Sequence, residues 1–354
     1  MRDFKVIGLM SGSSLDGLDI AYVNFSHDNK KWFFQIVEAG NVPYTDEWKN
    51  KLSEAFNKNE AELKELDIEF GKYIGSITKK FIKKYELDPK LIASHGHTIF
   101  HMPEKGYTLQ IGNGQEIANE TGIMTINDFR TEDVKKGGQG APLVPIGDKH
   151  LFADYPICLN IGGIANLSYD NEGKRIAYDI CMANQLLNYL ASKLGYDYDN
   201  NGNFARQGNV NQDLLNILND NPYYDKEAPK SLGREFFEQY QHKVIDESSL
   251  SAKDLLATAT EHIAYQIVRA TEHLESSKML ITGGGAKNNY LIERIRKMSK
   301  HEIVIPDTMI IDYKEALIFA FLGALKMEGR INVQSSVTGA TSDSSSGNIC
   351  LPQR

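Results

Sequence analysis

The sequence has 354 residues, of which 41% are hydrophobic and 24% are charged, with 29 glycines and 10 prolines. This is the balance of a globular protein, and at roughly 150 residues per domain the length predicts two domains. The 39 basic and 47 acidic residues give a net charge of −8, without the basic excess of a nucleic-acid-binding surface, so we expect no nucleic-acid partner.

The cysteine spacing and the apolar runs indicate the cellular compartment of the protein. Cys158, Cys181 and Cys350 are far apart and form no C-x-x-C pair, so the sequence suggests neither a disulfide framework nor a zinc knuckle. The N-terminus lacks the apolar core of a signal peptide, and the longest apolar run, 316–325, is shorter than the ~20 residues that cross a bilayer. We therefore expect a cytoplasmic protein with no membrane partner.

The first half of the chain reads as an α/β unit. Strands are predicted at 4–10 and 18–25, joined by a polar turn that contains glycine, and a third extended segment spans 32–39. Residues 45–85 have the spacing of two amphipathic helices. The later strands expected in this half are short and buried, at 90–94 and 124–127.

The second half repeats this opening. A buried strand begins near residue 155, turns at small residues and is followed by another strand. The later elements expected are helices at 184–194, 255–274 and 290–298 and a strand at 278–282. We predict a first domain at 1–150, completed by 332–354, and a second at 151–331. The serine-rich stretch 342–347 is expected to be a mobile surface loop.

The turn at 11–17 has the sequence Ser-Gly-Ser-Ser-Leu-Asp-Gly. Small residues let backbone N–H groups approach an anion, and hydroxyl groups add donors, so the turn is a candidate phosphate cradle. It lacks the G-x-x-x-x-G-K-[ST] pattern and is not a strand–loop–helix nucleotide site. A plain structural turn is the alternative.

Two further glycine turns are candidates for nucleotide contact, the first of them for phosphate and the second for adenine. The turn at 160–166 opens the second half as 11–17 opens the first, and two such cradles would hold one polyphosphate between them. The cluster 283–285 follows a strand, and its missing side chains would admit a flat adenine against the backbone. The alternative for 283–285 is a tight turn before a helix.

Two carboxylates are candidates for chemistry. Asp179 lies near the end of a predicted strand, where it would accept a proton or hold hydrated Mg²⁺, or else cap the next helix. Glu315 precedes the apolar run 316–325, and helix capping by a first-turn acid is its ordinary role.

A histidine cluster and an arginine complete the candidates. His95, His97 and His101 suggest a metal site, but alternate residues of a strand point to opposite faces, which favours polar contacts to a substrate. Arg130 precedes the glycine-rich segment 137–140 and is suited to binding a carboxylate, with a surface ion pair as the alternative.

These motifs resemble the anhydro-N-acetylmuramic acid kinase family in order along the chain, from about residue 6 to residue 341. The matching segments are 8–17, 94–98, 108–112, 128–130, 137–145, 160–166, 228–231, 233–235, 283–286 and 336–340. The family belongs to the actin-like superfamily of sugar kinases. The resemblance implies two ribonuclease-H-like α/β domains with ATP in the cleft between them, and a homodimer.

The resemblance also implies a reaction and its residues. Water opens the 1,6-anhydro bond of the sugar while O6 takes the γ-phosphate of ATP, giving N-acetylmuramic acid 6-phosphate in cell-wall recycling. Asp179 matches the general base, and Asp16 or Asp179 would hold Mg²⁺ through water. The implied sugar contacts are Thr98, Arg130, Gly138 and Glu315. The implied ATP contacts are Gly12, Ser13, Ser14, Leu15, Asp16, Gly17, Leu18, Asp19, Gly162, Gly163, Asn166, Gly283, Gly284 and Gly285.

One segment departs from the family pattern. Where the family commonly has D-T-G-P-G-N, residues 179–184 read Asp-Ile-Cys-Met-Ala-Asn, and the added side chains would alter nucleotide approach or narrow the sugar pocket. The alternatives are therefore a kinase of the same fold for another sugar, and a nucleotide-controlled binding protein that has lost turnover.

Overall fold

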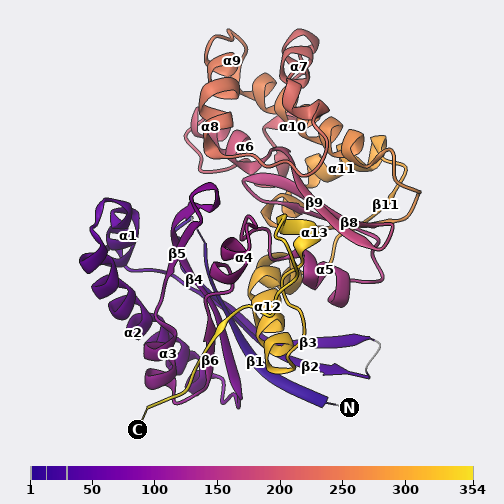
Figure 1. Cartoon of the computed structure of the whole chain (residues 1–354). Helices are drawn as coiled ribbons and strands as arrows, with labels where there is room; N and C mark the ends of the chain where they lie inside the picture. Colours follow the sequence, from indigo (N-terminus) through magenta and orange to yellow (C-terminus); the bar gives the residue numbers. More distant parts are fainter. Residues whose placement is uncertain (1, 13, 29–30, 354) are drawn as a thin grey trace. The chain divides into compact units, whose positions relative to one another are not determined.

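The computed structural model describes residues 2–12, 14–28 and 31–353 (Figure 1). The chain forms two compact units, Met1–Leu151 with Tyr313–Arg354, and Phe152–Asp312. The expected domain boundary at residue 331 differs from this division, because the helix that contains 316–325 packs in the first unit.

The first unit is built on a seven-stranded sheet of described residues in the order β12-β6-β4-β1-β2-β3, with β5 paired to β4. Its strands are β1 (Arg2–Ser11), β2 (Leu18–His27), β3 (Trp32–Val42), β4 (Leu91–Met102), β5 (Tyr107–Ile111), β6 (Thr125–Asn127) and β12 (Asn348–Cys350). β1 is antiparallel to β2 and parallel to β4, so the predicted hairpin is confirmed.

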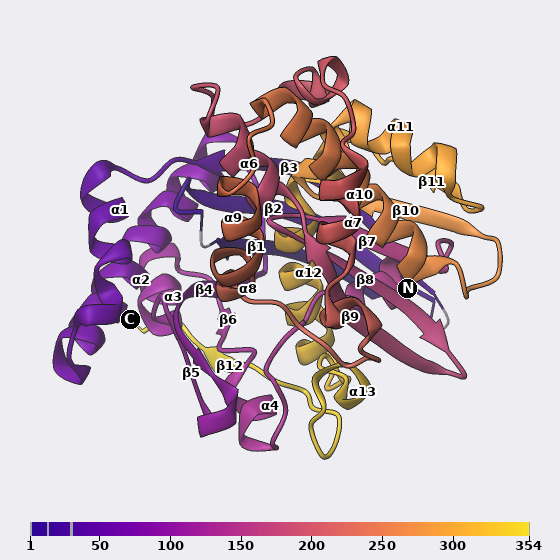
Figure 2. The same cartoon turned by 90° about the horizontal axis from the view of Figure 1, so that it is seen from above.

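Helices cover both faces of this sheet, with α2 and α3 (violet) on one and α12 (gold) on the other (Figures 1 and 2). The helical elements are α1 (Asp46–Ser53), η1 (Ala55–Asn57), α2 (Glu60–Lys84), η2 (Pro103–Lys105), α3 (Gly114–Thr121), α4 (Thr131–Lys135), α5 (Pro145–Leu151), α12 (Thr308–Met327) and α13 (Ser335–Thr338). The two helices predicted in 45–85 are confirmed. A capping box between Asn59 and Glu62 fixes the start of α2.

The apolar run 316–325 is the buried centre of α12. A Cβ at Gly323 would lie 2.7 Å from Ala93 of β4, so glycine on the helix lets it approach the sheet closely. Because α12 begins at Thr308, Glu315 lies two turns into the helix. The interpretation of Glu315 as a first-turn cap is therefore wrong.

The second unit has a five-stranded sheet of described residues in the order β11-β10-β7-β8-β9. Its strands are β7 (Ile157–Ile161), β8 (Ile164–Asn171), β9 (Lys174–Met182), β10 (Lys278–Thr282) and β11 (Glu302–Val304). β7 is antiparallel to β8 and parallel to β10, as β1 is to β2 and β4. Each unit thus opens with three antiparallel strands and continues with parallel ones, which confirms the predicted pair of ribonuclease-H-like α/β domains.

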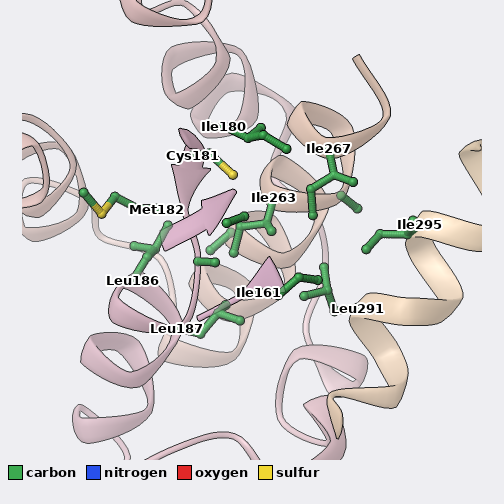
Figure 3. Close-up of a cluster of buried hydrophobic side chains, with 14 of the residues drawn as sticks. Ile161, Ile180, Cys181, Met182, Leu186, Leu187, Ile263, Ile267, Leu291 and Ile295 are labelled. Carbon is green, nitrogen blue, oxygen red and sulfur yellow. The ribbon is translucent and has the colours of Figure 1, made fainter. Parts of the chain in front are cut away.

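One hydrophobic core joins the sheet and helices of this unit, and Figure 3 shows its centre. The helical elements are α6 (Asn184–Ser192), η3 (Asn200–Gly202), η4 (Ala205–Gln207), α7 (Gln212–Asn219), η5 (Pro222–Asp225), α8 (Arg234–Phe236), the π-helix η6 (Phe237–Gln241), α9 (His242–Asp246), α10 (Ala252–Thr271), η7 (Gly284–Lys287) and α11 (Asn289–Met298). Among the described residues, every helix is too short or too polar to cross a bilayer.

The serine-rich stretch near the C-terminus is anchored, so the prediction of a mobile loop is wrong. Ser344 and Ser346 are buried, and Ser344 exchanges backbone hydrogen bonds with Val333. The Asn332 side chain accepts from the Ser346 N–H group at 2.7 Å. These contacts hold the chain in place before β12 joins the sheet.

Candidate active site

The turn between β1 and β2 presents hydroxyl and carboxylate groups to solvent. Leu15 has a positive φ of 58°, and its N–H group donates to the carbonyl oxygen of Gly12 at 3.4 Å. Ser14 Oγ donates to Asp16 Oδ1 at 2.7 Å, so the exposed carboxylate is held by its own turn. Ser13, which the resemblance implies as an ATP contact, lies outside the described residues.

The residues that follow anchor this turn to β3. A Cβ at Gly17 would lie 2.5 Å from the carbonyl oxygen of Val42, so packing requires glycine there. Leu18 is buried, and Asp19 Oδ1 accepts from Asn41 Nδ2 at 2.9 Å. Gly17 and Leu18 therefore have structural roles that explain them without a ligand.

The turn between β7 and β8 meets the start of α6. The carbonyl oxygen of Gly163 accepts from the N–H group of Ala183 at 2.8 Å, and that of Gly162 accepts from Asn184 at 3.0 Å. A Cβ added at Gly162 or Gly163 would have no neighbour closer than 3.5 Å. Packing therefore does not require either glycine.

In the glycine cluster that follows β10, packing requires two of the three glycines but not the third. Gly283 has a φ of 81°, and a Cβ there would lie 2.6 Å from Asn160 Oδ1. A Cβ at Gly285 would lie 2.7 Å from the Cβ of Ile161. Gly284 is exposed, and its nearest neighbour would be 3.4 Å away. The tight-turn interpretation thus explains Gly283 and Gly285 but leaves Gly284 unexplained.

Each of the three turns contains a glycine that the fold does not require. These residues are Gly12, the pair Gly162 and Gly163, and Gly284, and none has a positive φ. A residue without a side chain at such a position leaves the backbone open to a ligand. All three turns therefore suit contact with a nucleotide.

Asp179 is held in β9 by contacts with η5 and with the loop between η5 and α8. Its Oδ2 accepts from the N–H group of Leu232 at 2.9 Å, its own N–H group donates to the Lys230 carbonyl oxygen at 3.2 Å, and its carbonyl oxygen accepts from Tyr223 Oη at 2.6 Å. The cap of α6 is Ala183, so the helix-capping alternative for Asp179 is wrong.

The environment of this carboxyl group favours proton uptake. Desolvation raises the pKa of Asp179 above its ordinary value, and the hydrogen bond from Leu232 offsets this only in part. The side chain remains half-buried, opposite Asn166 of β8. Asp179 is thus a fixed, partly accessible carboxylate with a raised pKa, which are the properties of a general base.

Arg130 lies at the start of α4, in the first unit. Its Nε and Nη2 donate to His95 Nε2 at 3.0 and 2.9 Å, and its Nη1 donates to the Gly140 carbonyl oxygen at 2.6 Å. Burial lowers the pKa of Arg130 to about 10, and Glu315 opposes this shift. Because Arg130 is half-buried and bonded on both sides, the surface ion-pair alternative is wrong.

Gly138 has a packing role within the same loop. It is buried, its N–H group donates to the Asp133 carbonyl oxygen at 2.9 Å, and a Cβ there would lie 2.8 Å from that of Ala340. The Asp133 side chain accepts from the Gly140 N–H group and from Thr338 Oγ1 at 2.8 and 2.7 Å. Asp133, which the sequence analysis did not single out, therefore organises the loop.

The remaining implied sugar contacts, Thr98 and Glu315, also lie in the first unit. Thr98 Oγ1 of β4 accepts from Gln110 Nε2 at 3.4 Å. Glu315 is an exposed residue, but the protein around its carboxyl group desolvates it and raises its pKa. The positive charges of Arg130 and Lys314 act in the opposite direction and lower this pKa. Glu315 and Arg130 are near enough to interact electrostatically.

The rings of His95 and His97 lie on opposite faces of the sheet, but strand alternation is not the reason, because residues two apart share a face in a regular strand. The extra residue of β4 between Ser94 and His97 interrupts the alternation and separates the two rings. The ring of His95 lies 4.6 Å from that of Phe319 on α12, and the ring of His97 lies 6.4 Å from that of Phe70 on α2. The described part of the chain has no group of three or more potential metal ligands. The structure therefore disfavours the metal interpretation.

The segment that departs from the family pattern, residues 179–184, packs largely in the hydrophobic core. Cys181, Met182 and Ala183 are each 0% exposed. Figure 3 shows the first two among core side chains such as Leu186 and Ile263. Their side chains are therefore unavailable to narrow a sugar pocket, which removes the observation that favoured a binding protein without turnover.

Sequence comparison with known proteins points to one family. Residues 4–352 match the anhydro-N-acetylmuramic acid kinase family. Proteins of that name from Pasteurella multocida, Shewanella halifaxensis and Caldanaerobacter subterraneus are 36%, 35% and 34% identical, over 97%, 99% and 98% of this chain and 96%, 99% and 96% of their own. The solved (R)-2-hydroxyglutaryl-CoA dehydratase component A of Acidaminococcus fermentans covers 92% of this chain and 99% of its own at 12% identity, with a TM-score of 0.48.

Proposed function

The chain belongs to the anhydro-N-acetylmuramic acid kinase family, a family of sugar kinases, and we propose that it phosphorylates O6 of 1,6-anhydro-N-acetylmuramic acid with ATP while water opens the anhydro bond. The observation that carries this proposal is the state of Asp179. One carboxylate oxygen is fixed by the Leu232 N–H group, and desolvation raises the pKa, so the group is poised to take a proton.

The chemistry assigned to Asp179 is activation of water. The hydrogen bond to Oδ2 orients the carboxylate, and Oδ1 then accepts a proton from the water that attacks the anomeric carbon. The bond from that carbon to O6 breaks, and O6 accepts the phosphoryl group. Arg130 and Glu315 would contact the sugar, each supplying a charged group.

The phosphates of ATP would contact the turns that hold the open glycines Gly12 and Gly163, and Gly284 would lie against the adenosine. Asp16 is an exposed carboxylate, and its oxygen chemistry suits a hydrated Mg²⁺ ion, as does that of Asp179. Magnesium would offset the negative charge of the phosphates when it is bound.

The experiment that tests this function measures two products, ADP and the labelled sugar. Incubation with the anhydro sugar and ATP in ¹⁸O water should release ADP only when the sugar is present, and should place ¹⁸O on the anomeric carbon. ADP release with an ordinary sugar and no label would instead identify a kinase of the same fold in which Asp179 activates a hydroxyl group. No ADP with any sugar would refute the kinase activity.

The cytoplasmic location, expected from the cysteine spacing and the apolar runs, and the homodimer, implied by the resemblance, stay predictions. Light scattering during size-exclusion chromatography tests the second of them directly. A mass of about 80 kDa is expected for a dimer of the 39.7 kDa chain, and a mass near that of one chain would contradict it.

A further inference from the structure

β4 carries one extra residue beside β1 at the histidine motif. Between the pairs that join Leu9 to Ser94 and Ser11 to His97, two residues of β4 face one residue of β1. One of the two is Gly96, which has a φ of 73° and whose added Cβ would lie 2.5 Å from a carbonyl oxygen of β5. Such a bulge redirects the neighbouring side chain and carbonyl group.

The bulge fixes the proton of His95 on one ring nitrogen. Nε2 accepts two hydrogen bonds from Arg130, and a guanidinium group only donates, so Nε2 carries no proton. Nδ1 lies 2.9 Å from the carbonyl oxygen of Gly96 and must donate to it. The ring is buried and packs on Phe319. His95 is therefore a neutral imidazole in its Nδ1–H form.

This contact determines which edge of Arg130 is available. His95 occupies the edge formed by Nε and Nη2, and Gly140 takes one N–H group of Nη1. One N–H group then remains on each terminal nitrogen for another acceptor. Glu315 attracts Arg130 electrostatically, yet within the described part of the chain no ion pair joins the two.

We propose that His95 is a positioning residue, which holds the guanidinium group of Arg130 apart from Glu315 so that both charged groups stay open to the sugar. The inference rests on the proposed function, because Arg130 and Glu315 are its sugar contacts. Without the imidazole acceptor, Arg130 would turn toward Glu315, and the two would neutralise each other in the empty site. The sugar would then have to compete with an internal ion pair.

A double-mutant cycle between His95 and Arg130 tests this role. His95→Phe keeps a ring to pack on Phe319 but removes the acceptor, whereas His95→Gln keeps an acceptor oxygen. We expect H95F to raise KM for the sugar about 10-fold to 100-fold with KM for ATP unchanged, since a charged hydrogen bond contributes on that scale. H95Q should restore most of the loss. In an Arg130→Ala background, H95F should add no further effect on sugar affinity, measured by titration calorimetry. An equal effect in both backgrounds, or no rescue by glutamine, would overturn the proposal.

Nuclear magnetic resonance separates this inference from the proposed function. The ¹⁵N shifts of the His95 ring in the sugar-free protein should show a protonated Nδ1 and an unprotonated Nε2, whichever substrate the enzyme uses. A proton on Nε2 would overturn the positioning role while leaving the kinase activity standing. If the wild-type protein released no ADP with the anhydro sugar, the proposed function would fail and the ring measurement would still report on His95.

Discussion

Asp179 of β9 pairs with Asn166 of β8 directly beside a β-bulge, in which Ile180 has no partner across the ladder. In a regular strand Ile180 and Cys181 would point to opposite faces, but both belong to one core cluster. The extra residue thus lets two consecutive side chains enter the core while Asp179 stays half-buried. The bulge therefore gives the candidate base its access.

Asp179→Asn should reduce kcat by about 100-fold to 10,000-fold, the usual contribution of a general base. The amide keeps the shape of the side chain and an oxygen for the Leu232 N–H group, so only proton acceptance is lost. Sugar-dependent ADP release measures the effect, and nucleotide titration should give the wild-type affinity. Asp197→Asn, an exposed acid of the same unit, is the matched control. Unchanged turnover in D179N would remove Asp179 from the mechanism.

As the pH is lowered, the activity should begin to fall at a pH above the ordinary pKa of an aspartate side chain. The base must be deprotonated to accept a proton, and desolvation raises the pKa of Asp179 from 3.8. Consequently kcat/KM declines as the pH is lowered through that raised pKa, and it does so at a higher pH than for an exposed aspartate. The pH profile of the residual activity in D179N should lack this limb. Its persistence there would assign the limb to another group.

The strand–turn–strand openings could be predicted from sequence because buried apolar runs and small-residue turns are local patterns. The bulge at Gly96 and the role of Asp133 could not, since both depend on partners distant along the chain. Thr338, for example, reaches Asp133 from 205 residues away. The start of α12 also differs from the prediction, because the charged residues Asp312, Lys314 and Glu315 separate the apolar residues of its first turn from the apolar run 316–325.

The interpretation of the departing segment failed for a related reason. The sequence alone shows that Cys181 and Ala183 replace glycines of the family pattern, but not whether their side chains face the core or the ligand site. Both side chains lie in the hydrophobic core. Glycine clusters posed the same difficulty, because Gly284 and Gly285 are indistinguishable until the packing around each is known.

Gly284→Ala and Gly285→Ala form a matched pair. A methyl group at 284 meets nothing closer than 3.4 Å, so stability should change by less than about 0.5 kcal/mol while KM for ATP rises. The same group at 285 overlaps Ile161 and should cost about 1–3 kcal/mol. Urea unfolding and nucleotide titration measure both variants. Loss of stability at 284 with unchanged ATP affinity would contradict a ligand role for this glycine.

Cys181→Gly restores the residue common in the family at this position and should affect stability rather than catalysis. The thiol is 0% exposed within the core, so its removal leaves a small void, and glycine also adds freedom to the unfolded chain. We expect a loss of about 1–3 kcal/mol in urea unfolding. Values of kcat and of KM for the sugar should stay within about threefold of the wild type, because no substrate touches a side chain buried there. A clear gain in sugar affinity would show instead that this segment limits the pocket, and would reopen the hypothesis of a different substrate.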